Sequence, residues 1–193
     1  MDCWRRRSGL NSPSLFTRAG ECSFTGTLGM NVTVSYLELT RPPTPPDERP
    51  CAASIAAEKL CSDEYLSLYT RVGESVRWDQ RLRMPRAELA EFLGSTRSQI
   101  YVLRDALAQP IGLCEFERAL PDIELKNFGL VPSAQGKGLG SFLLRTALQR
   151  EWQLQPRRIW LHTDSWDHPA AIKLYQSAGF QVYLTREEPP GEL

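Results

Sequence analysis

The sequence predicts an α/β protein with a mixed, mostly antiparallel β-sheet flanked by helices. Three strand patterns follow one another with only short turns between them, which is typical of an antiparallel meander, at residues 99–104, 111–118 and 122–131. Helix and strand patterns then alternate to the end of the chain, at residues 139–152, 158–162, 169–178 and 180–185. This order of elements is that of a layered α/β fold.

The first half of the chain contains one predicted strand and two predicted helices. Val32, Val34 and Tyr36 alternate with polar residues, which predicts a strand over residues 30–39. A helix is expected from Ser62, as its N-cap, to Gly73, and a second helix is expected over residues 85–93. The segment between the two helices, residues 76–81, is expected to be irregular.

The 193 residues are expected to form one domain. We expect this domain over residues 30–188, with a proline-rich loop at 40–53 and a polar tail at 189–193. Residues 1–29 are rich in arginine and have no apolar periodicity, so we expect a disordered or non-native leader with Met30 as the true start. An organellar transit peptide is the alternative for this leader.

Composition and charge exclude several classes of protein. The chain has 23 Lys and Arg against 23 Asp and Glu, so it lacks the basic surplus that is typical of nucleic-acid-binding domains. It has no apolar run of about 18 residues, so we expect no membrane-spanning helix. Its five cysteines are scattered, which favours reduced thiols in a cytoplasmic protein over a disulfide framework or a zinc site.

A glycine-rich segment, Gln135-Gly-Lys-Gly-Leu-Gly140, lies between a predicted strand and a predicted helix. The amides of such a loop and of the following helical turn can converge on an anion such as a pyrophosphate. The segment is not a P-loop, because Gly138 follows Lys137 where that motif needs Ser or Thr, and its Gly-x-Gly-x-Gly spacing is not that of dinucleotide-binding proteins. A tight strand-to-helix turn without a ligand is the alternative.

The segment resembles the coenzyme A loop of the GNAT (general N-acetyltransferase) superfamily, of the form Arg/Gln-x-x-Gly-x-Gly/Ala, which Gln135, Gly138 and Gly140 match. Phe128-Gly-Leu-Val-Pro132 is similar to the end of the fourth strand in that family. Residues 168–180 are similar to the family motif Asn-x-x-Ala-x-x-Leu-Tyr-x-x-x-Gly-Phe, with His168 in place of Asn. The resemblance covers about residues 98–185, and the run from His162 to Pro169 resembles a branch of the family with unassigned substrate.

The resemblance implies a GNAT fold, in which the sheet splays between its fourth and fifth strands, and acetyl-CoA as co-substrate without a metal ion. It implies coenzyme contacts from the fourth strand, from the glycine-rich segment and from the start of the last helix: Phe128, Gly129, Leu130, Gln135, Gly136, Lys137, Gly138, Leu139, Gly140, Ser141 and His168. In this scheme the amide of Leu130 polarises the thioester carbonyl.

The resemblance also suggests two catalytic residues. Glu124 occupies the position of a catalytic glutamate in many members, which makes it the expected general base for the amine. Tyr175 is the expected general acid for the departing thiolate. The alternatives are a solvated carboxylate paired with Lys126 or an arginine for Glu124, and core packing for Tyr175.

The fourth strand carries a signal that does not depend on the family. Its apolar residues fall at odd positions first, Ile123 and Leu125, and then at even positions, Phe128 and Leu130. Because side chains alternate with a period of two, this change predicts either a β-bulge near residues 127–129 or a strand that is buried on both faces.

The acceptor side is expected to contain aromatic and polar residues from two segments: Trp78, Arg81, His162, Asp164 and Trp166. Surface packing is the alternative for the two tryptophans and the arginine. His162, Asp164, Asp167 and His168 also suggest a metal site, but Pro169 is expected to start a helix and Asp167, two residues before it, to cap that helix, which favours a cap and a role in the acceptor pocket. The acidic residues near this site favour a cationic amine: Glu115, Glu117, Glu124 and Asp164.

Together these features predict an acetyl-CoA-dependent N-acetyltransferase that transfers an acetyl group directly to a primary amine of a small molecule or a peptide. The alternative is a non-catalytic CoA-binding module that has kept the fold, since fold does not fix function. We expect no nucleic-acid or membrane partner. A homodimer is possible, because many GNAT proteins pair.

Overall fold

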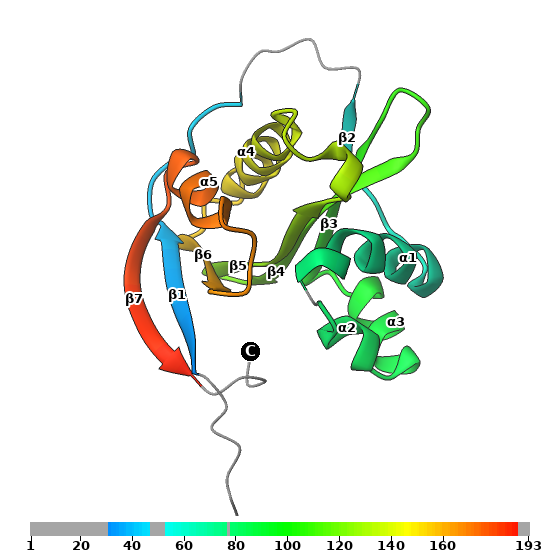
Figure 1. The fold of residues 1–193 in the computed structure, drawn as a ribbon, viewed down its shortest axis with the longest axis horizontal. Helices are drawn as coiled ribbons and strands as arrows, with labels where there is room; N and C mark the ends of the chain where they lie inside the picture. Colours follow the sequence, from blue (N-terminus) through cyan, green and yellow to red (C-terminus); the bar gives the residue numbers. More distant parts are fainter. Residues whose placement is uncertain (1–30, 47–52, 77, 189–193) are drawn as a thin grey trace, which may run out of the picture.

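The computed structural model describes residues 31–46, 53–76 and 78–188 of the chain (Figure 1). Its elements in chain order are β1 (Val32–Leu39), β2 (Ser54–Ala57), α1 (Ser62–Gly73), η1 (Glu74–Val76), α2 (Gln80–Arg83), α3 (Arg86–Gly94), β3 (Ser98–Arg104), β4 (Pro110–Ala119), β5 (Asp122–Leu130), η2 (Pro132–Ala134), α4 (Leu139–Trp152), β6 (Arg158–Asp164), α5 (Ala171–Ser177) and β7 (Gln181–Glu188). The described strands form one seven-stranded sheet in the order β2-β3-β4-β5-β6-β1-β7. Neighbouring strands are antiparallel except β5 and β6, which confirms the predicted mixed, mostly antiparallel α/β fold.

The first strand lies far from its sequence neighbours. β1 is inserted between β6 and β7, with Val34 opposite Asp164 on one side and opposite Arg186 on the other (Figure 1). Alternation buries its apolar side chains, of which Val32 and Val34 are fully buried. The sheet wall that contains β6 is therefore completed by a segment from the other end of the chain.

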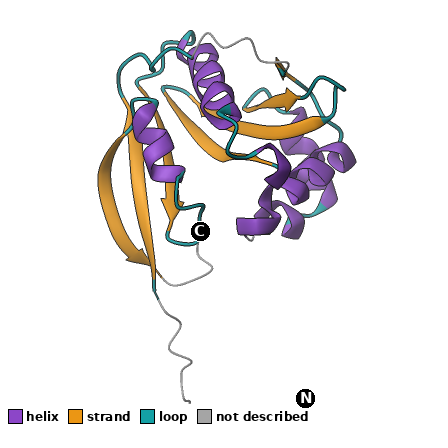
Figure 2. Ribbon diagram, turned by 45° about the horizontal axis from the view of Figure 1, so that its top comes forward, coloured by secondary structure: helices purple, strands orange, loops and turns teal. Residues whose placement is uncertain are grey.

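Helices cover both faces of the sheet, as β4 shows by its alternation. Glu115 points to one face, where it accepts hydrogen bonds from Tyr65 of α1 and Arg81 of α2. Arg118 points to the other face, where its Nε donates to Glu151 of α4 at 2.8 Å. Helices α1–α3 thus form one layer and α4 lies in the other; Figure 2 shows the two groups of helices on opposite sides of the strands.

Most predicted elements agree with the structure to within two residues at each end, although the last strand continues beyond residue 185 to Glu188. Two short elements, β2 and α2, were not predicted, because they are too short for an apolar period to show. The prediction of Ser62 as the N-cap of α1 is wrong. Cys61 holds that position, and its amide donates to Glu64 Oε2 at 2.9 Å in a capping box.

The proline-rich segment is described over residues 40–46, which contain neither helix nor strand. The amide of Thr44 donates to the carbonyl of Ala178 at 3.1 Å, so this segment crosses the end of α5. The predictions for residues 1–29, for Met30 and for residues 189–193 lie outside the described residues. Of the described helices, none is long and apolar enough to cross a membrane.

Candidate active site

The sheet opens between its two parallel strands. β5 and β6 pair only from Asp122 to Glu124 against Arg158 to Trp160, although β5 continues to Leu130 and β6 to Asp164. Beyond this short ladder the strands diverge, and among the described strands β6 keeps only β1 as its neighbour. These are the fourth and fifth of the predicted strands, so the expected splay is confirmed.

A β-bulge lies at the start of the divergence. Glu115 pairs with Asn127 and Phe116 pairs with Leu125, so that Lys126 has no partner on β4. One extra residue bends the strand and increases its twist. The bulge lies one residue before the predicted segment, and it accounts for the change of parity that the sequence shows.

The strand register shows which backbone groups the splay exposes. The amide of Val131 donates to the carbonyl of Ile111 at 3.0 Å, so these opposite residues form a hydrogen-bonded pair. Since such pairs alternate along an antiparallel ladder, the Phe128 and Leu130 positions are non-hydrogen-bonded toward β4, and their amides face the gap beside β6. The Leu130 carbonyl accepts a hydrogen bond from Gln135 Nε2 at 3.1 Å. Of the two backbone polar groups of Leu130, the amide therefore stays available to a ligand.

The glycine-rich segment forms the other half of the opening. Gly136 and Gly138 have φ of 73° and 76°, a conformation that glycine adopts without penalty, and Gly138 is the N-cap of α4. Among the described residues, no acceptor binds the amides of Gly136, Lys137 and Gly138, and the first turn of α4 adds further amides without intrahelical partners. The segment therefore offers a cluster of free donors at the positive end of a helix.

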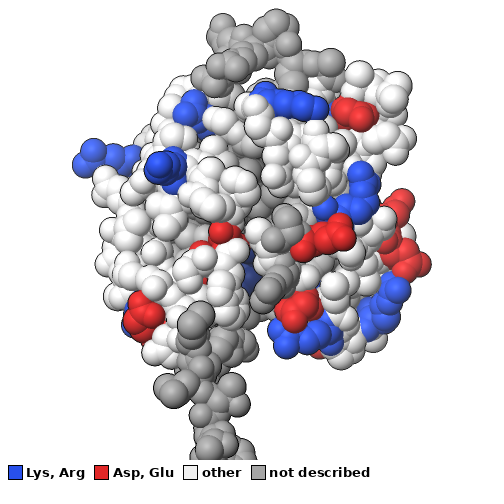
Figure 3. Space-filling model, viewed as in Figure 1, with Lys and Arg blue, Asp and Glu red and all other residues white. Residues whose placement is uncertain are grey.

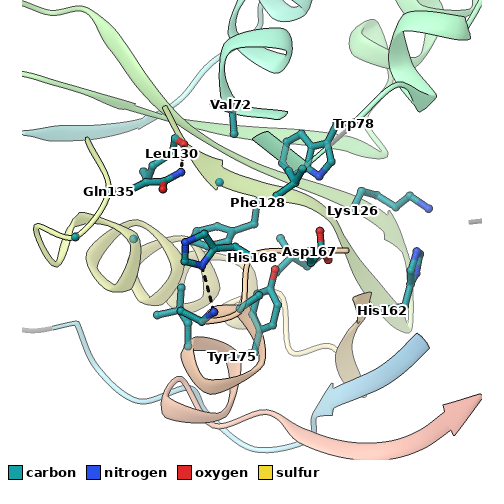
Figure 4. A pocket seen from close by; sticks show the side chains of 18 residues that line it. Val72, Trp78, Lys126, Phe128, Leu130, Gln135, His162, Asp167, His168 and Tyr175 are labelled. Carbon is teal, nitrogen blue, oxygen red and sulfur yellow. Dashed lines mark hydrogen bonds between the residues drawn. The ribbon is translucent and has the colours of Figure 1, made fainter. Parts of the chain in front are cut away.

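A cavity of about 400 Å³ leads from these donors into the splayed sheet (Figure 4). Seven of the residues expected to contact the coenzyme line it: Phe128, Gly129, Leu130, Gln135, Gly136, Gly140 and His168. Lys137, Gly138, Leu139 and Ser141 do not line it, and the Lys137 ammonium donates to the carbonyl of Ser133 at 2.8 Å. Trp78 and Phe128 extend into this cavity from opposite sides in Figure 4.

Two residues that line this cavity, Val72 and Gly129, pack closely against each other. A Cβ added at Gly129 would lie 2.6 Å from Cγ1 of Val72, the buried residue near the end of α1. We expect Gly129→Ala to cost roughly 1–3 kcal/mol of the free energy of unfolding, because the close contact must be relieved. Urea unfolding measures the loss. Gly94→Ala is the control, since nothing lies within 4 Å of its added Cβ, and it should be neutral or stabilising.

A double substitution tests whether the contact with Val72 causes the loss of stability in Gly129→Ala. If the clash with Val72 is responsible, Val72→Ala should be less destabilising in the Gly129→Ala background than in the wild type, a coupling typical of residues in contact. Additive effects of the two substitutions would contradict this explanation.

A second cavity of about 420 Å³ adjoins the first on the side of β6 and α2. Four of the residues expected on the acceptor side line it: Trp78, His162, Asp164 and Trp166. Five residues line both cavities, which therefore adjoin each other along these side chains: Val76, Trp78, Lys126, His162 and Asp167. Figure 3 shows a hollow in the middle of this face, with acidic side chains at its rim.

The structure does not bring Arg81 to the acceptor side, which corrects the sequence-based expectation. Its side chain is 6% exposed and its guanidinium is paired with the fully buried Glu115. It therefore belongs to the core beneath α2. Glu115 and Glu117 also lie outside the lining of both cavities, the latter paired with Arg97 at 2.5 Å, so neither supports the inference of a cationic amine.

The two expected catalytic residues differ in their surroundings. Glu124 lines neither cavity; its carboxylate binds the Lys126 ammonium at 3.0 Å and lies 3.8 Å from Nδ1 of His162. Its role as a base stays a prediction. Tyr175 lines the first cavity, and its ring packs against that of Phe128. It is therefore both a packed residue and a residue of the site, the two alternatives that the sequence left open.

Asp167 does not cap the last helix, contrary to the expectation. Ala170 is the N-cap of α5, and its amide donates to Nδ1 of His168 at 3.2 Å. Asp167 Oδ2 instead accepts from the Thr163 hydroxyl at 2.5 Å, which holds the carboxylate at the end of β6. Among the described residues, no group of three His, Cys, Asp or Glu side chains comes together in a way that could hold a metal ion.

Asp167, expected in the acceptor pocket, lines both cavities. Seven residues that line the first cavity were not predicted as part of the site: Val72, Val76, Leu125, Lys126, Ala170, Ala171 and Leu174. Val72 and Leu174 gave a helix-face signal that does not distinguish a core contact from a cavity wall. Lys126 could have been found only by knowing where the bulge turns its side chain.

Comparison with known proteins agrees with this geometry. Residues 62–180 match the acetyltransferase (GNAT) family, and among curated proteins no sequence matches the chain. A GCN5-related N-acetyltransferase from Sphaerobacter thermophilus has a similar fold, with a TM-score of 0.59 and 18% identity over 84% of this chain and 53% of that chain. A putative acetyltransferase of the GNAT family from Novosphingobium aromaticivorans has a TM-score of 0.56 and 19% identity over 82% of this chain and 65% of that chain. A tandem GNAT protein from the clavulanic acid biosynthesis pathway has a TM-score of 0.58 and 16% identity over 84% of this chain and 55% of that chain.

The chain spans between half and two thirds of these three solved chains. The cleft of this chain opens where two parallel strands separate, next to free helix-start amides. Since the family match extends over more than half of its residues, the chain belongs to the acetyltransferase (GNAT) family.

Proposed function

We propose that the protein is an acetyl-CoA-dependent N-acetyltransferase that transfers the acetyl group directly to a primary amine of a small molecule or a peptide. The observation that carries this proposal is the position of the Phe128 and Leu130 amides, which face the splay at the mouth of the first cavity. An extended thioester arm needs such unpaired strand donors, and the free amides of the glycine-rich segment suit the pyrophosphate to which that arm is attached.

The parts of acetyl-CoA correspond to different residues of the first cavity. The pyrophosphate would bind at the amides of residues 136–141, and the pantetheine would follow the backbone of residues 128–130. The Leu130 amide would then donate to the thioester oxygen as negative charge develops on it. One such donor is worth about 3 kcal/mol of barrier in comparable acyl-transfer sites.

The acceptor amine would occupy the second cavity, which Asp164 at the end of β6 lines together with three aromatic residues: Tyr69, Trp78 and Trp166. The two substrates would meet where the cavities join, and holding them there accounts for several kcal/mol of barrier in favourable cases. Tyr175 lines the coenzyme cavity and can supply a proton to the departing thiolate.

The test is to mix the protein, acetyl-CoA and a panel of primary amines and to follow the release of free CoA thiol. We expect release that depends on the amine, and a mass increase of one acetyl group on the accepted amine. Calorimetry with CoA gives the binding step separately. CoA binding without amine-dependent release would favour the non-catalytic module, and absence of binding to any acyl-CoA would contradict the proposal.

A further inference from the structure

Three titratable side chains lie at the boundary between the two cavities. Lys126, His162 and Asp167 line both cavities, so each can contact a donor on one side and an acceptor on the other. An amine arrives at neutral pH as an ammonium ion and attacks only after it loses a proton. A group that takes this proton directly is expected at this boundary, because the nitrogen must reach the thioester there.

The three side chains differ in what they can accept. Lys126 is a cation already paired with Glu124 at 3.0 Å. His162 turns Nδ1 toward Glu124 at 3.8 Å and packs its ring near that of Tyr36, with the centroids 5.9 Å apart. Asp167 is the only anion of the three, and a negative charge also attracts the ammonium before it takes the proton.

One oxygen of the Asp167 carboxylate accepts hydrogen bonds from described residues, and the other accepts none. Oδ2 accepts from the Thr163 hydroxyl at 2.5 Å and has a longer contact, 3.4 Å, with the Asp164 amide. No described residue donates a hydrogen bond to Oδ1, and the residue lines both cavities. The fixed oxygen orients the carboxylate, and the open oxygen is available to a ligand.

We propose that Asp167 accepts the proton of the acceptor ammonium through Oδ1, and that it is the general base of the reaction. The inference rests on the proposed acetyl transfer and names its proton acceptor. Glu124, which the family position suggests for this role, lines neither cavity and is paired with Lys126.

The steps balance. The ammonium N–H bond breaks and its proton moves to Asp167, and the free amine forms a C–N bond to the thioester carbon. The tetrahedral intermediate loses the thiolate as the C–S bond breaks, and the thiolate takes the proton of the Tyr175 hydroxyl. The nitrogen then returns one proton to the Tyr175 phenolate, and Asp167 releases its proton to solvent, so the products are the amide, CoA thiol and one proton.

Asp167 and Tyr175 are coupled in a way that suits this order. Tyr175 directs its hydroxyl toward Asp167 (Figure 4). Burial raises the pKa of Tyr175, and the negative charge of Asp167 raises it further. Once Asp167 has taken a proton this second effect disappears, so Tyr175 becomes a stronger acid when the thiolate needs it.

The environment of Asp167 predicts the pH dependence. Burial raises the pKa of Asp167 above its usual value, and the charge of Asp164 acts in the same direction, whereas the Thr163 hydroxyl and His162 act against it. The base works only when ionised, so kcat/KM should rise with pH through this raised pKa. The charged and titratable groups that face Asp167 from the surrounding elements are His162 and Asp164 of β6, Lys126 of β5, Tyr175 of α5, and Asp79 and Arg83 around α2.

The experiment compares kcat/KM for the amine from pH 5 to 9, at saturating acetyl-CoA, in four proteins: wild type, Asp167→Asn, Asp167→Glu and Glu124→Gln. We expect Asp167→Asn to lower kcat/KM by about 100-fold or more and to remove the acid limb, with CoA affinity by calorimetry unchanged. Asp167→Glu should keep an acid limb with part of the rate. Glu124→Gln should keep the limb and lose less than about tenfold.

Several results would overturn the inference. It fails if Asp167→Asn keeps the acid limb, if Glu124→Gln or His162→Gln removes it instead, or if Asp167→Asn loses CoA binding. A readout independent of turnover is the carboxyl ¹³C titration of Asp167 by NMR in the free protein, where a pKa at or below the usual aspartate range would contradict it. If the wild type transfers acetyl to no amine, the proposed function itself fails, and this inference with it.

Discussion

Replacing Gly138 by aspartate should abolish coenzyme A binding and leave the protein folded. Gly138 is the N-cap of α4, a position at which aspartate usually stabilises a helix, although its φ of 76° costs a side chain about 1 kcal/mol. The added carboxylate would take up the helix-start amides and place a negative charge where the pyrophosphate must bind. We expect CoA affinity by calorimetry to fall by about 100-fold or more, equivalent to at least about 2.7 kcal/mol.

Gly138→Asn is the matched control for this prediction. Asparagine has nearly the same size and tolerates positive φ, but it carries no charge. It should retain much more of the CoA affinity than Gly138→Asp does, while both proteins melt near the wild-type temperature. Equal losses in the two variants would mean that space, and not charge, decides binding at this loop.

Replacing Glu115 by alanine should destabilise the protein by about 3–5 kcal/mol, the usual cost of leaving one member of a buried ion pair without its partner. Glu115 is fully buried and accepts hydrogen bonds from Tyr65, Arg81 and Asn127, the last at 3.1 Å. Its removal leaves the Arg81 guanidinium, also buried, without a counter-ion. Urea unfolding followed by circular dichroism measures the effect.

Glu117→Ala is the control on the same strand. Glu117 also binds an arginine, but Arg97 is 62% exposed, so the loss should be at most about 1 kcal/mol. If Glu115→Ala does not fold, the double variant Arg81→Met with Glu115→Leu should recover stability, because it removes both charges together. Similar losses in Glu115→Ala and Glu117→Ala would contradict the importance of burial.

The fold could be predicted largely from local signals. Gly73 and Gly94 mark the ends of two helices, and the parity change on β5 indicates a bulge that the register confirms at Lys126. The neighbours of β1 could not be predicted, because the alternation of Val32 and Val34 shows that one face is buried but not which strands flank it.

The sequence predicts the parts of the candidate site that are formed by the backbone. The glycines of the loop were found because their spacing indicates positive φ, and the residues of β5 were found because their alternation indicates a strand. Arg81 was misplaced because its charge suggests solvent, whereas its partner Glu115 lies thirty-four residues away in sequence and only the fold brings the two together. Asp167 was taken for a helix cap for a similar reason, since its contact with Thr163 depends on the turn after β6.

The place of β1 sets the order in which this protein can be completed during synthesis. Val34 leaves the ribosome long before its partners Asp164 and Arg186, which follow it by more than a hundred residues. Until then a strand with fully buried native positions stays unpaired, which is a hazard for aggregation. The wall that carries His162 therefore forms only after these later strands are made, and a nascent chain can acquire helices α1–α3 long before it can acquire the acceptor side of its cleft.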